Sequence, residues 1–255
     1  MRFGILGSGS QGNALVVEVG ETRLLLDCGF SLGETARRLG RLGLTPDQIT
    51  AILITHEHDD HIGGAARLAR KFGLPIWLTP GTLRGLEGLF AGVERLHYLE
   101  GYAPLCIGDV EVRPFPVPHD AREPAQYRFS DGARSLGVLT DTGCVTPLIL
   151  RMLDACSALV LECNHDSELL AASGYPEPLK RRISSRHGHL DNTAAAGLLA
   201  SLDSRHLQHV VAAHLSQTNN RPDLARSALA GALVCEPDWV AVADQVAGLG
   251  WREIA

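Results

Sequence analysis

Short apolar runs separated by glycine-rich turns open the chain and predict strands. FGIL (3–6), ALVVEV (14–19) and RLLLDCG (23–29) alternate with the turn sequences GSGSQGN and GET. Leucine-rich and β-branched runs of this length between glycine clusters are typical of a strand meander. The pattern therefore predicts a sheet that starts within the first residues.

Helical spacing follows and then alternates with further strands. SLGETARRLGRLGL (31–44) and GGAARLARKFG (63–73) have the spacing of helices, and Gly73 is a plausible C-cap for the second. The same spacing returns in LDNTAAAGLLASL (190–202) and PDLARSALAGAL (222–233). These four segments are predicted to be helices.

Three further apolar runs each end in polar residues. They are SLGVLTDTG (135–143), SALVLECNHD (157–166) and HVVAAHLS (209–216). Apolar strands whose carboxyl ends each deliver His or Asp suggest a site gathered on one edge of the sheets. The predicted fold class is therefore an α/β sandwich.

Composition bounds the organisation and the partners. A chain of 255 residues with 45% hydrophobic and 20% charged residues is ordinary for a globular protein, and we expect one domain over 1–255. No apolar run approaches the roughly 18 residues of a membrane helix, and no leader pattern precedes the first strand. We therefore expect no membrane partner and a cytoplasmic location. With a net charge of -6, an anionic substrate must be held by local charge.

The cysteines do not indicate a disulfide framework. They are scattered, with no C-x-x-C pair and no spacing typical of a structural zinc site. We expect buried, reduced thiols at Cys28, Cys106, Cys144, Cys156, Cys163 and Cys235.

The segment THEHDDHIGG (55–64) concentrates three histidines and three acidic residues in six positions after the apolar run AILI. His56, His58, Asp60 and His61 have the spacing H-x-H-x-D-H, and imidazole and carboxylate groups bind zinc, manganese or iron. One turn does not easily direct four donors at one tetrahedral ion. It can serve two ions about 3.5 to 4 Å apart, as in two-metal hydrolytic sites. Burying these charges without a cation would be costly.

Further ligand candidates end later apolar stretches, namely His119 in PVPHDA, Asp141 in LTDTG and His214 in AAHLS. Together with the opening motif, this order of residues resembles the metallo-β-lactamase fold superfamily. The resemblance extends from Asp27 to His214. It implies an αββα sandwich with two divalent metal ions, zinc or manganese, with iron also admitted.

The resemblance also implies roles for these residues. His56, His58 and His119 would bind one ion, Asp60, His61 and His214 the other, and Asp141 would bridge them. A hydroxide held between the ions would be the nucleophile, which makes Asp60 a catalytic candidate as well as a ligand. Asp27 is expected to support the site from outside the ligand set. His165 and Asp166 could either belong to the site or stabilise a loop.

A basic segment, LKRRISSRHGHLDN (179–192), stands out in this acidic chain. Its Lys and Arg residues could grip phosphates or could form a solvated loop, and its place between two ligand positions favours phosphate binding. Arg186 and His189 are the candidate contacts. By resemblance to phosphodiesterase relatives, His189 is also the candidate general acid. GSGSQGN lacks the lysine and helix of a P-loop, but Ser10 and Asn13 are possible donors to a phosphate.

Taken together, GSGSQGN, THEHDDHIGG, LECNHD, GHLDN and HLSQTNN resemble the YycJ (WalJ) subfamily, which is related to the phosphodiesterase PhnP. The resemblance implies a 5′ to 3′ exonuclease that takes double-stranded DNA as substrate. Three alternatives remain open: a small-molecule phosphodiesterase acting on cyclic nucleotides, a thioesterase of the glyoxalase II type, and a regulatory protein with structural metals.

Overall fold

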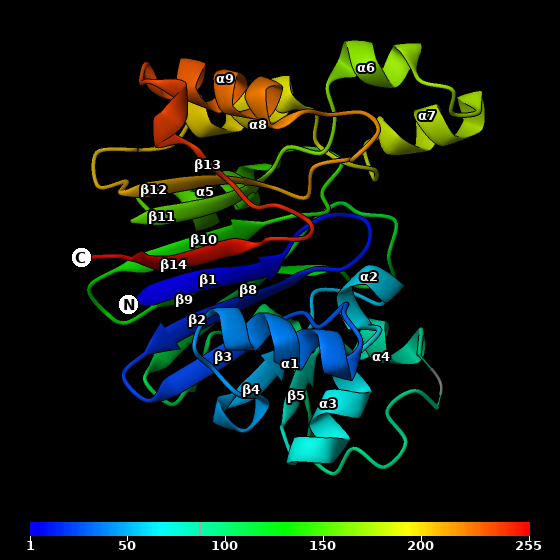
Figure 1. Ribbon diagram of the computed structural model, residues 1–255, viewed down its shortest axis with the longest axis vertical. Coiled ribbons are helices and arrows are strands. Elements are labelled where there is room, and N and C mark those ends of the chain that lie inside the picture. Colours follow the sequence, from blue (N-terminus) through cyan, green and yellow to red (C-terminus); the bar gives the residue numbers. More distant parts are fainter. Residues whose placement is uncertain (87) are drawn as a thin grey trace.

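Two seven-stranded sheets lie at the centre of the computed structural model, which describes residues 1–86 and 88–255 (Figure 1). The first sheet has the order β14 (Leu249–Glu253), β1 (Arg2–Gly7), β2 (Ala14–Val19), β3 (Thr22–Leu26), β4 (Ala51–Leu53), β5 (Ile76–Leu78) and β6 (Leu96–Tyr98). The second has the order β13 (Ala241–Val242), β12 (His209–Ala213), β11 (Ala158–Glu162), β10 (Ser135–Leu139), β9 (Ala125–Ser130), β8 (Val110–Pro116) and β7 (Leu105–Ile107). Strands β3 to β6 pair in parallel, and so do β10 to β13.

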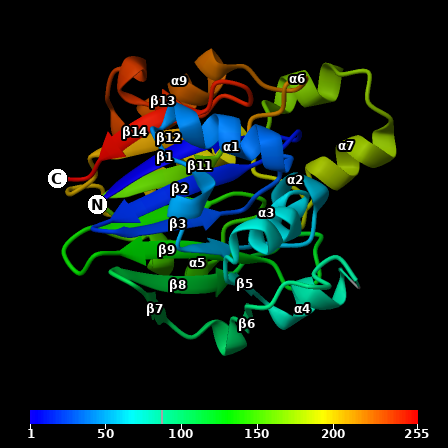
Figure 2. The ribbon, with the colours of Figure 1, turned by 60° about the horizontal axis from the view of Figure 1, so that its bottom comes forward.

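Helices cover the outer face of each sheet. α1 (Leu32–Arg41) and α3 (Ala65–Phe72) pack on the first sheet, and α5 (Pro147–Leu153), α8 (Asn192–Ala200) and α9 (Pro222–Leu233) pack on the second (Figure 1). The short helices α2 (Asp59–Ile62), α4 (Pro80–Arg84), α6 (Ser167–Ala172) and α7 (Glu177–Ile183) lie toward the end opposite the chain termini (Figure 2). No helix in the described ranges is long and apolar enough to cross a membrane. This αββα sandwich confirms the predicted fold class.

Three apolar layers hold these elements together. Phe3 and Tyr127 are fully buried between the sheets. Leu39 of α1 and Leu68 of α3 are buried against the first sheet, and Leu199 of α8 is buried against the second. Each large apolar side chain removed from water contributes roughly 1.5–3 kcal/mol. The layers therefore give a firm frame to the residues that project from the strand ends.

The helices predicted from the sequence are present, with shifted ends in places. α3 ends before Gly73, whose φ of 65° is left-handed, as the predicted C-cap requires. The helix predicted over 31–44 is shorter, because α1 ends at Arg41 and Gly43 turns the chain with a φ of 72°. α9 covers the predicted range 222–233.

The prediction for the cysteines is correct only in part. All six are free thiols; Cys28, Cys156 and Cys163 are buried, but Cys106 is exposed and Cys144 and Cys235 are partly exposed. Cys106 lies on β7, the edge strand of the second sheet, where one face of the strand meets water. Apolar neighbours in the sequence therefore did not mean burial there.

Tyr127 ties the two sheets together and leads to a prediction about stability. Its hydroxyl on β9 donates a 2.6 Å hydrogen bond to the carbonyl of Ile54, directly after β4. Tyr127→Phe leaves this buried carbonyl without that donor, so the free energy of unfolding should fall by about 1–3 kcal/mol in a urea titration. Tyr98→Phe, at an exposed side chain, is the matched control and should change it by less than about 0.5 kcal/mol. Equal losses in both variants would contradict this role.

Candidate metal centre

The H-x-H-x-D-H motif spans the join between β4 and α2. β4 is fully buried, and the backbone is still extended at His58, with φ -66° and ψ 143°. His58 is the N-cap of α2, so Asp60 and His61 lie in the first turn of the helix. The change from extended chain to helix lets the four side chains approach one centre from two directions.

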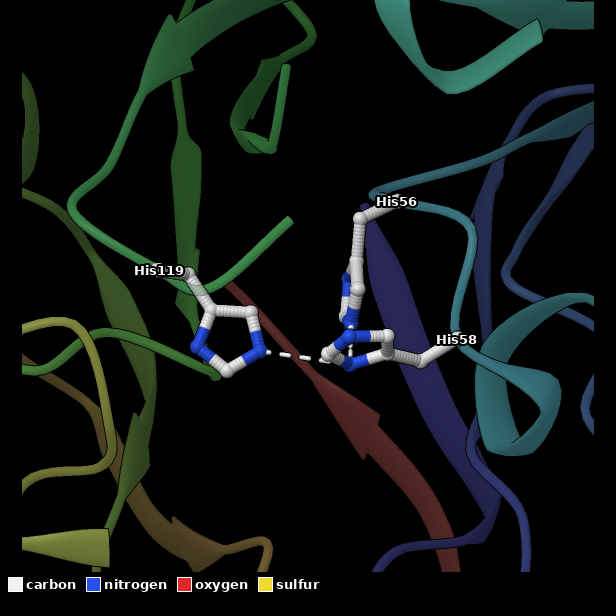
Figure 3. Close-up of side chains that lie close together, drawn as sticks. All are labelled: His56, His58 and His119. Carbon is white, nitrogen blue, oxygen red and sulfur yellow. Dashed lines mark hydrogen bonds between the residues drawn. The ribbon is translucent and has the colours of Figure 1, made fainter. Parts of the chain in front are cut away.

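Three imidazoles form a first group of possible ligands. His56 Nε2 lies 2.9 Å from His58 Nδ1, which lies 3.4 Å from His119 Nε2. Figure 3 shows His56 and His58 projecting from the motif toward His119, which follows β8. Burial lowers the pKa of His56 well below its ordinary value, and the neighbouring His61 and His119 add to this effect. Neutral imidazoles carry lone pairs, so this group can present them to one cation.

Asp60, His61 and His214 form a second group. Asp60 Oδ2 lies 3.5 Å from His61 Nε2 and 3.6 Å from His214 Nε2. Asp141 Oδ2 lies 3.2 Å from His61 Nε2, and its Oδ1 lies 3.9 Å from His119 Nε2. Asp141 therefore reaches both groups, as a bridging carboxylate must. The structure brings together all seven residues that the sequence singled out as ligands.

Close opposite charges set the ionisation of the second group. Burial opposes charge on Asp60, but the nearby imidazoles of His214 and His61 outweigh it and hold the pKa of Asp60 below its usual range. Burial also opposes protonation of His214, but Asp141, Asp60 and Glu162 raise its pKa to about 10. The carboxylates therefore favour positive charge at this position, and a divalent cation would provide it.

Two buried atoms of the centre lack a hydrogen-bond partner within the described residues, Asp141 Oδ2 and His214 Nε2. Buried polar atoms are normally paired, and an unpaired one costs about 1–3 kcal/mol. Imidazole and carboxylate donors suit zinc, manganese and iron. The residues therefore fit divalent metal ions, one at each group.

Three residues of the centre hold a strained backbone. Asp27, Asp141 and His214 have φ values of 60°, 52° and 55°, in the left-handed region. They follow the carboxyl ends of β3, β10 and β12. Such a conformation costs a non-glycine residue about 1–3 kcal/mol and persists where surrounding contacts enforce it. Here it turns each side chain away from its strand and toward the centre.

Asp27 and Asn13 support the motif from outside. Asp27 Oδ2 lies 2.8 Å from His61 Nδ1, and both of its oxygens accept hydrogen bonds from Thr55. Because Asp27 holds His61 Nδ1, the other ring nitrogen, Nε2, faces Asp60. Asn13 donates its backbone N–H to the carbonyl of Asp60 at 2.7 Å, and its Nδ2 lies 3.3 Å from Asp60 Oδ2. Asp27 lies where a supporting carboxylate was expected, and Asn13 orders the metal motif.

A buried glutamate that the sequence analysis did not single out completes the centre. Glu162 ends β11 and is fully buried, with Oε1 2.7 Å from His189 Nδ1 and 3.3 Å from His214 Nδ1. Burial opposes its charge, but His189 and His214 outweigh it and lower the pKa of Glu162. Its place at the end of the apolar run 157–166 was the available signal. Within that run, only His165 and Asp166 were predicted as candidates from the sequence.

Those two residues have different surroundings. Asp166 is the N-cap of α6, and its Oδ1 accepts the backbone N–H groups of Glu168 and Leu169. His165 is buried and forms an isolated β-bridge with Asp191. Of the two alternatives, membership of the site or stabilisation of a loop, the contacts of Asp166 match the second.

The candidate substrate contacts separate in space. Ser10 and His189 line one cavity beside the centre, and Arg182 lines it as well. Arg186 is exposed and lies outside this lining. Arg182 lies within α7 and its Nε donates a 2.6 Å hydrogen bond to Asp120 Oδ2, whereas Arg186 comes after the helix has ended. The position at which α7 ends thus separates the arginine that lines the cavity from the one that does not.

Comparisons with known proteins agree with this arrangement. The family model described as "Beta-lactamase superfamily domain" matches residues 22–214. Exodeoxyribonuclease YycJ of Bacillus anthracis is 38% identical over 91% of this chain and 89% of its own, and exodeoxyribonuclease WalJ of Streptococcus pneumoniae is 34% identical over 91% and 88%. A diphosphatase structure from the PhnP family has a TM-score of 0.71 at 19% identity, covering 100% of this chain and 99% of that one. The resemblance inferred from the motifs is confirmed.

The position of Asp141 between the two groups leads to a prediction about metal binding. Asp141→Ala should weaken the binding of metal by at least about tenfold, because both groups lose a donor. Titration of metal-stripped protein against a chromogenic chelator measures the change. Asp166→Ala, which removes a carboxylate that caps α6, is the control and should bind metal as the wild type does. Unchanged affinity in Asp141→Ala would contradict the shared role.

Proposed function

The chain belongs to the β-lactamase superfamily, and from that premise we propose that it is a metal-dependent phosphodiester hydrolase that removes nucleotides from double-stranded DNA in the 5′ to 3′ direction. The observation that carries the proposal is the pair of ligand groups joined by Asp141, beside a cavity lined by His189 and Arg182. The relatives that match 91% of the chain are named exodeoxyribonucleases, which supports DNA as the substrate. A DNA substrate also favours a cytoplasmic site of action.

The proposed metal ligands divide between two ions. His56, His58 and His119 would hold one, Asp60, His61 and His214 would hold the other, and Asp141 would be shared. When bound, such ions supply Lewis-acid charge to a phosphate and lower the pKa of coordinated water to about 7. Zinc or manganese is the proposed metal, and the donor set also admits iron.

His189 is the proposed proton donor to the leaving oxygen. Its Nδ1 is held 2.7 Å from Glu162 Oε1, which leaves Nε2 as the ring nitrogen available for a proton transfer. Burial opposes protonation of His189, but the charge of Glu162 outweighs it and raises the pKa of His189. As the bond from phosphorus to the leaving oxygen breaks, that oxygen takes the proton. Glu162 acts through His189 and positions it.

The place of α7 favours a phosphate substrate over a thioester. Asp120 Oδ2 accepts the bond from Arg182, and Asp120 Oδ1 lies 3.4 Å from His119 Nε2. The guanidinium is therefore close to a proposed metal ligand, where it can pair with a phosphate. Lys180 secures the helix by donating to the carbonyl of Ala171 at 2.6 Å.

A phosphodiesterase for small molecules would use the same charges, so the size of the substrate is the first property to test. Metal-stripped protein is supplied with zinc or manganese and given a 5′-labelled DNA duplex or bis(p-nitrophenyl) phosphate. We expect progressive loss of nucleotides from the duplex with added metal, and none with Asp60→Ala. Cleavage of the small diester alone would move the function to small diesters. Cleavage of neither substrate would contradict phosphodiester hydrolysis.

The role of His189 gives a second prediction for the same assay. His189→Ala should lower kcat on the duplex by about 10²- to 10⁴-fold, the usual contribution of a general acid, while the protein keeps its metal. His187→Ala is the matched control, because this exposed histidine lies two residues away on the same segment. Loss of metal from the His189→Ala variant would indicate that His189 is a metal ligand. Full activity of the variant would contradict its role as the proton donor.

A further inference from the structure

A cavity of about 300 Å³ lies beside the metal centre, under α7. Its walls come from the glycine-rich loop, the segment after β8, the region of α6 and α7, and the loop after β12. Its lining includes Asp120, Tyr175, Arg182, His189 and Asn219. Figures 1 and 2 show α7 at the same end of the sandwich as α2, which carries the metal motif. The cavity therefore adjoins the reacting groups.

One side of the cavity carries charge and the proposed proton donor. His189 lines it in the orientation set by Glu162, and Arg182 lines it from α7. The side chains of Arg182 and Asp120 are 62% and 30% exposed, so water reaches their ion pair. Exposed ion pairs are weak, and a phosphate can compete for the guanidinium. This side suits the phosphate of a substrate.

The other side suits a flat group with polar edges. Tyr175 is half-buried in the wall of the cavity. Asn219 is 1% exposed, and neither atom of its side-chain amide has a hydrogen-bond partner within the described residues. Buried amides are normally paired, so this wall has unused capacity for hydrogen bonds. Aromatic side chains bind nucleic-acid bases of any identity by stacking.

We propose that the cavity holds the single terminal nucleoside of the DNA strand, with its phosphate at the metal centre and its base against Tyr175; this rests on the proposed exonuclease function. A volume of about 300 Å³ is at the lower end for ligand pockets, a size that suits one nucleoside better than a base pair. The terminal nucleotide must therefore leave its complement before cleavage, as in enzymes that take one base out of a duplex.

The test compares two duplexes whose 5′-terminal nucleotide has no complement, so that neither needs opening; in one this nucleotide carries its base and in the other it is abasic. For the holoenzyme, kcat/KM should be about 5- to 150-fold higher with the base, the range for one base stacked on an aromatic side chain. Tyr175→Ala should bring this ratio close to unity, whereas Tyr175→Phe keeps a ring and should keep the ratio. Tyr98→Ala, at an exposed tyrosine, is the matched control and should behave as the wild type.

The ratio is measured within each variant, so partial unfolding affects both substrates equally and cancels. A wild-type ratio in Tyr175→Ala would overturn the nucleoside pocket and leave the exonuclease function intact. Failure of the wild type to degrade either duplex would instead remove the function on which the pocket rests. A duplex whose terminal pair is covalently cross-linked between the strands should resist release, and release at the ordinary rate would overturn the need for strand opening.

Discussion

Buried carboxylates and imidazoles packed against one another are the constraint on which the rest of the structure depends. An isolated charge removed from water is costly, and breaking a buried pair by removing one partner is more damaging than the pair is stabilising. In the centre, two further carboxylates outside the proposed ligand set lie against the imidazoles. Asp27 lies 2.8 Å from His61 Nδ1, and Glu162 lies 2.7 Å from His189 Nδ1. Each outer carboxylate therefore balances charge and also decides which nitrogen of its histidine faces the centre.

The topology of the sheets makes this concentration of charge possible. β3 and β4 pair in parallel, and so do β10, β11 and β12, so their carboxyl ends reach the same end of the sandwich. The residues after these strands cannot simply continue outward, because their side chains must converge. The left-handed backbone at Asp27, Asp141 and His214 provides that convergence. The apolar layers and the hydrogen bond from Tyr127 to Ile54 keep the two sheets together, and this packing enforces the strained backbone.

The parts of the centre that the sequence predicted are those with a local or ordered pattern. The spacing of His56, His58, Asp60 and His61 lies in one turn, and His119, Asp141 and His214 could be placed because their order resembles a known family. Glu162 has no such pattern. Its partners His189 and His214 lie 27 and 52 residues away, so only the folded chain brings the three together.

The sequence did not predict that Arg182, and not Arg186, lines the cavity, and the reason is a different one. Both belong to one basic run, and the outcome depends on where α7 ends, at Ile183. Helix ends are the least certain feature of a sequence pattern. The exposed thiol of Cys106 has a related cause, since an apolar run does not reveal that its strand lies at the edge of a sheet.

The basic segment and the metal ligands are joined by the backbone into one unit. A Cβ atom on Gly143, two residues after Asp141, would lie 2.3 Å from the carbonyl carbon of Arg186, so the two segments pack with no room for a side chain. The carbonyl of Gly188 lies 3.1 Å from His119 Nδ1, next to His189 in the chain. The same few residues thus orient a proposed ligand and carry the proposed proton donor. Changes in α6 and α7 beyond this contact can therefore alter the substrate while the centre stays intact, which is how one fold accommodates different reactions.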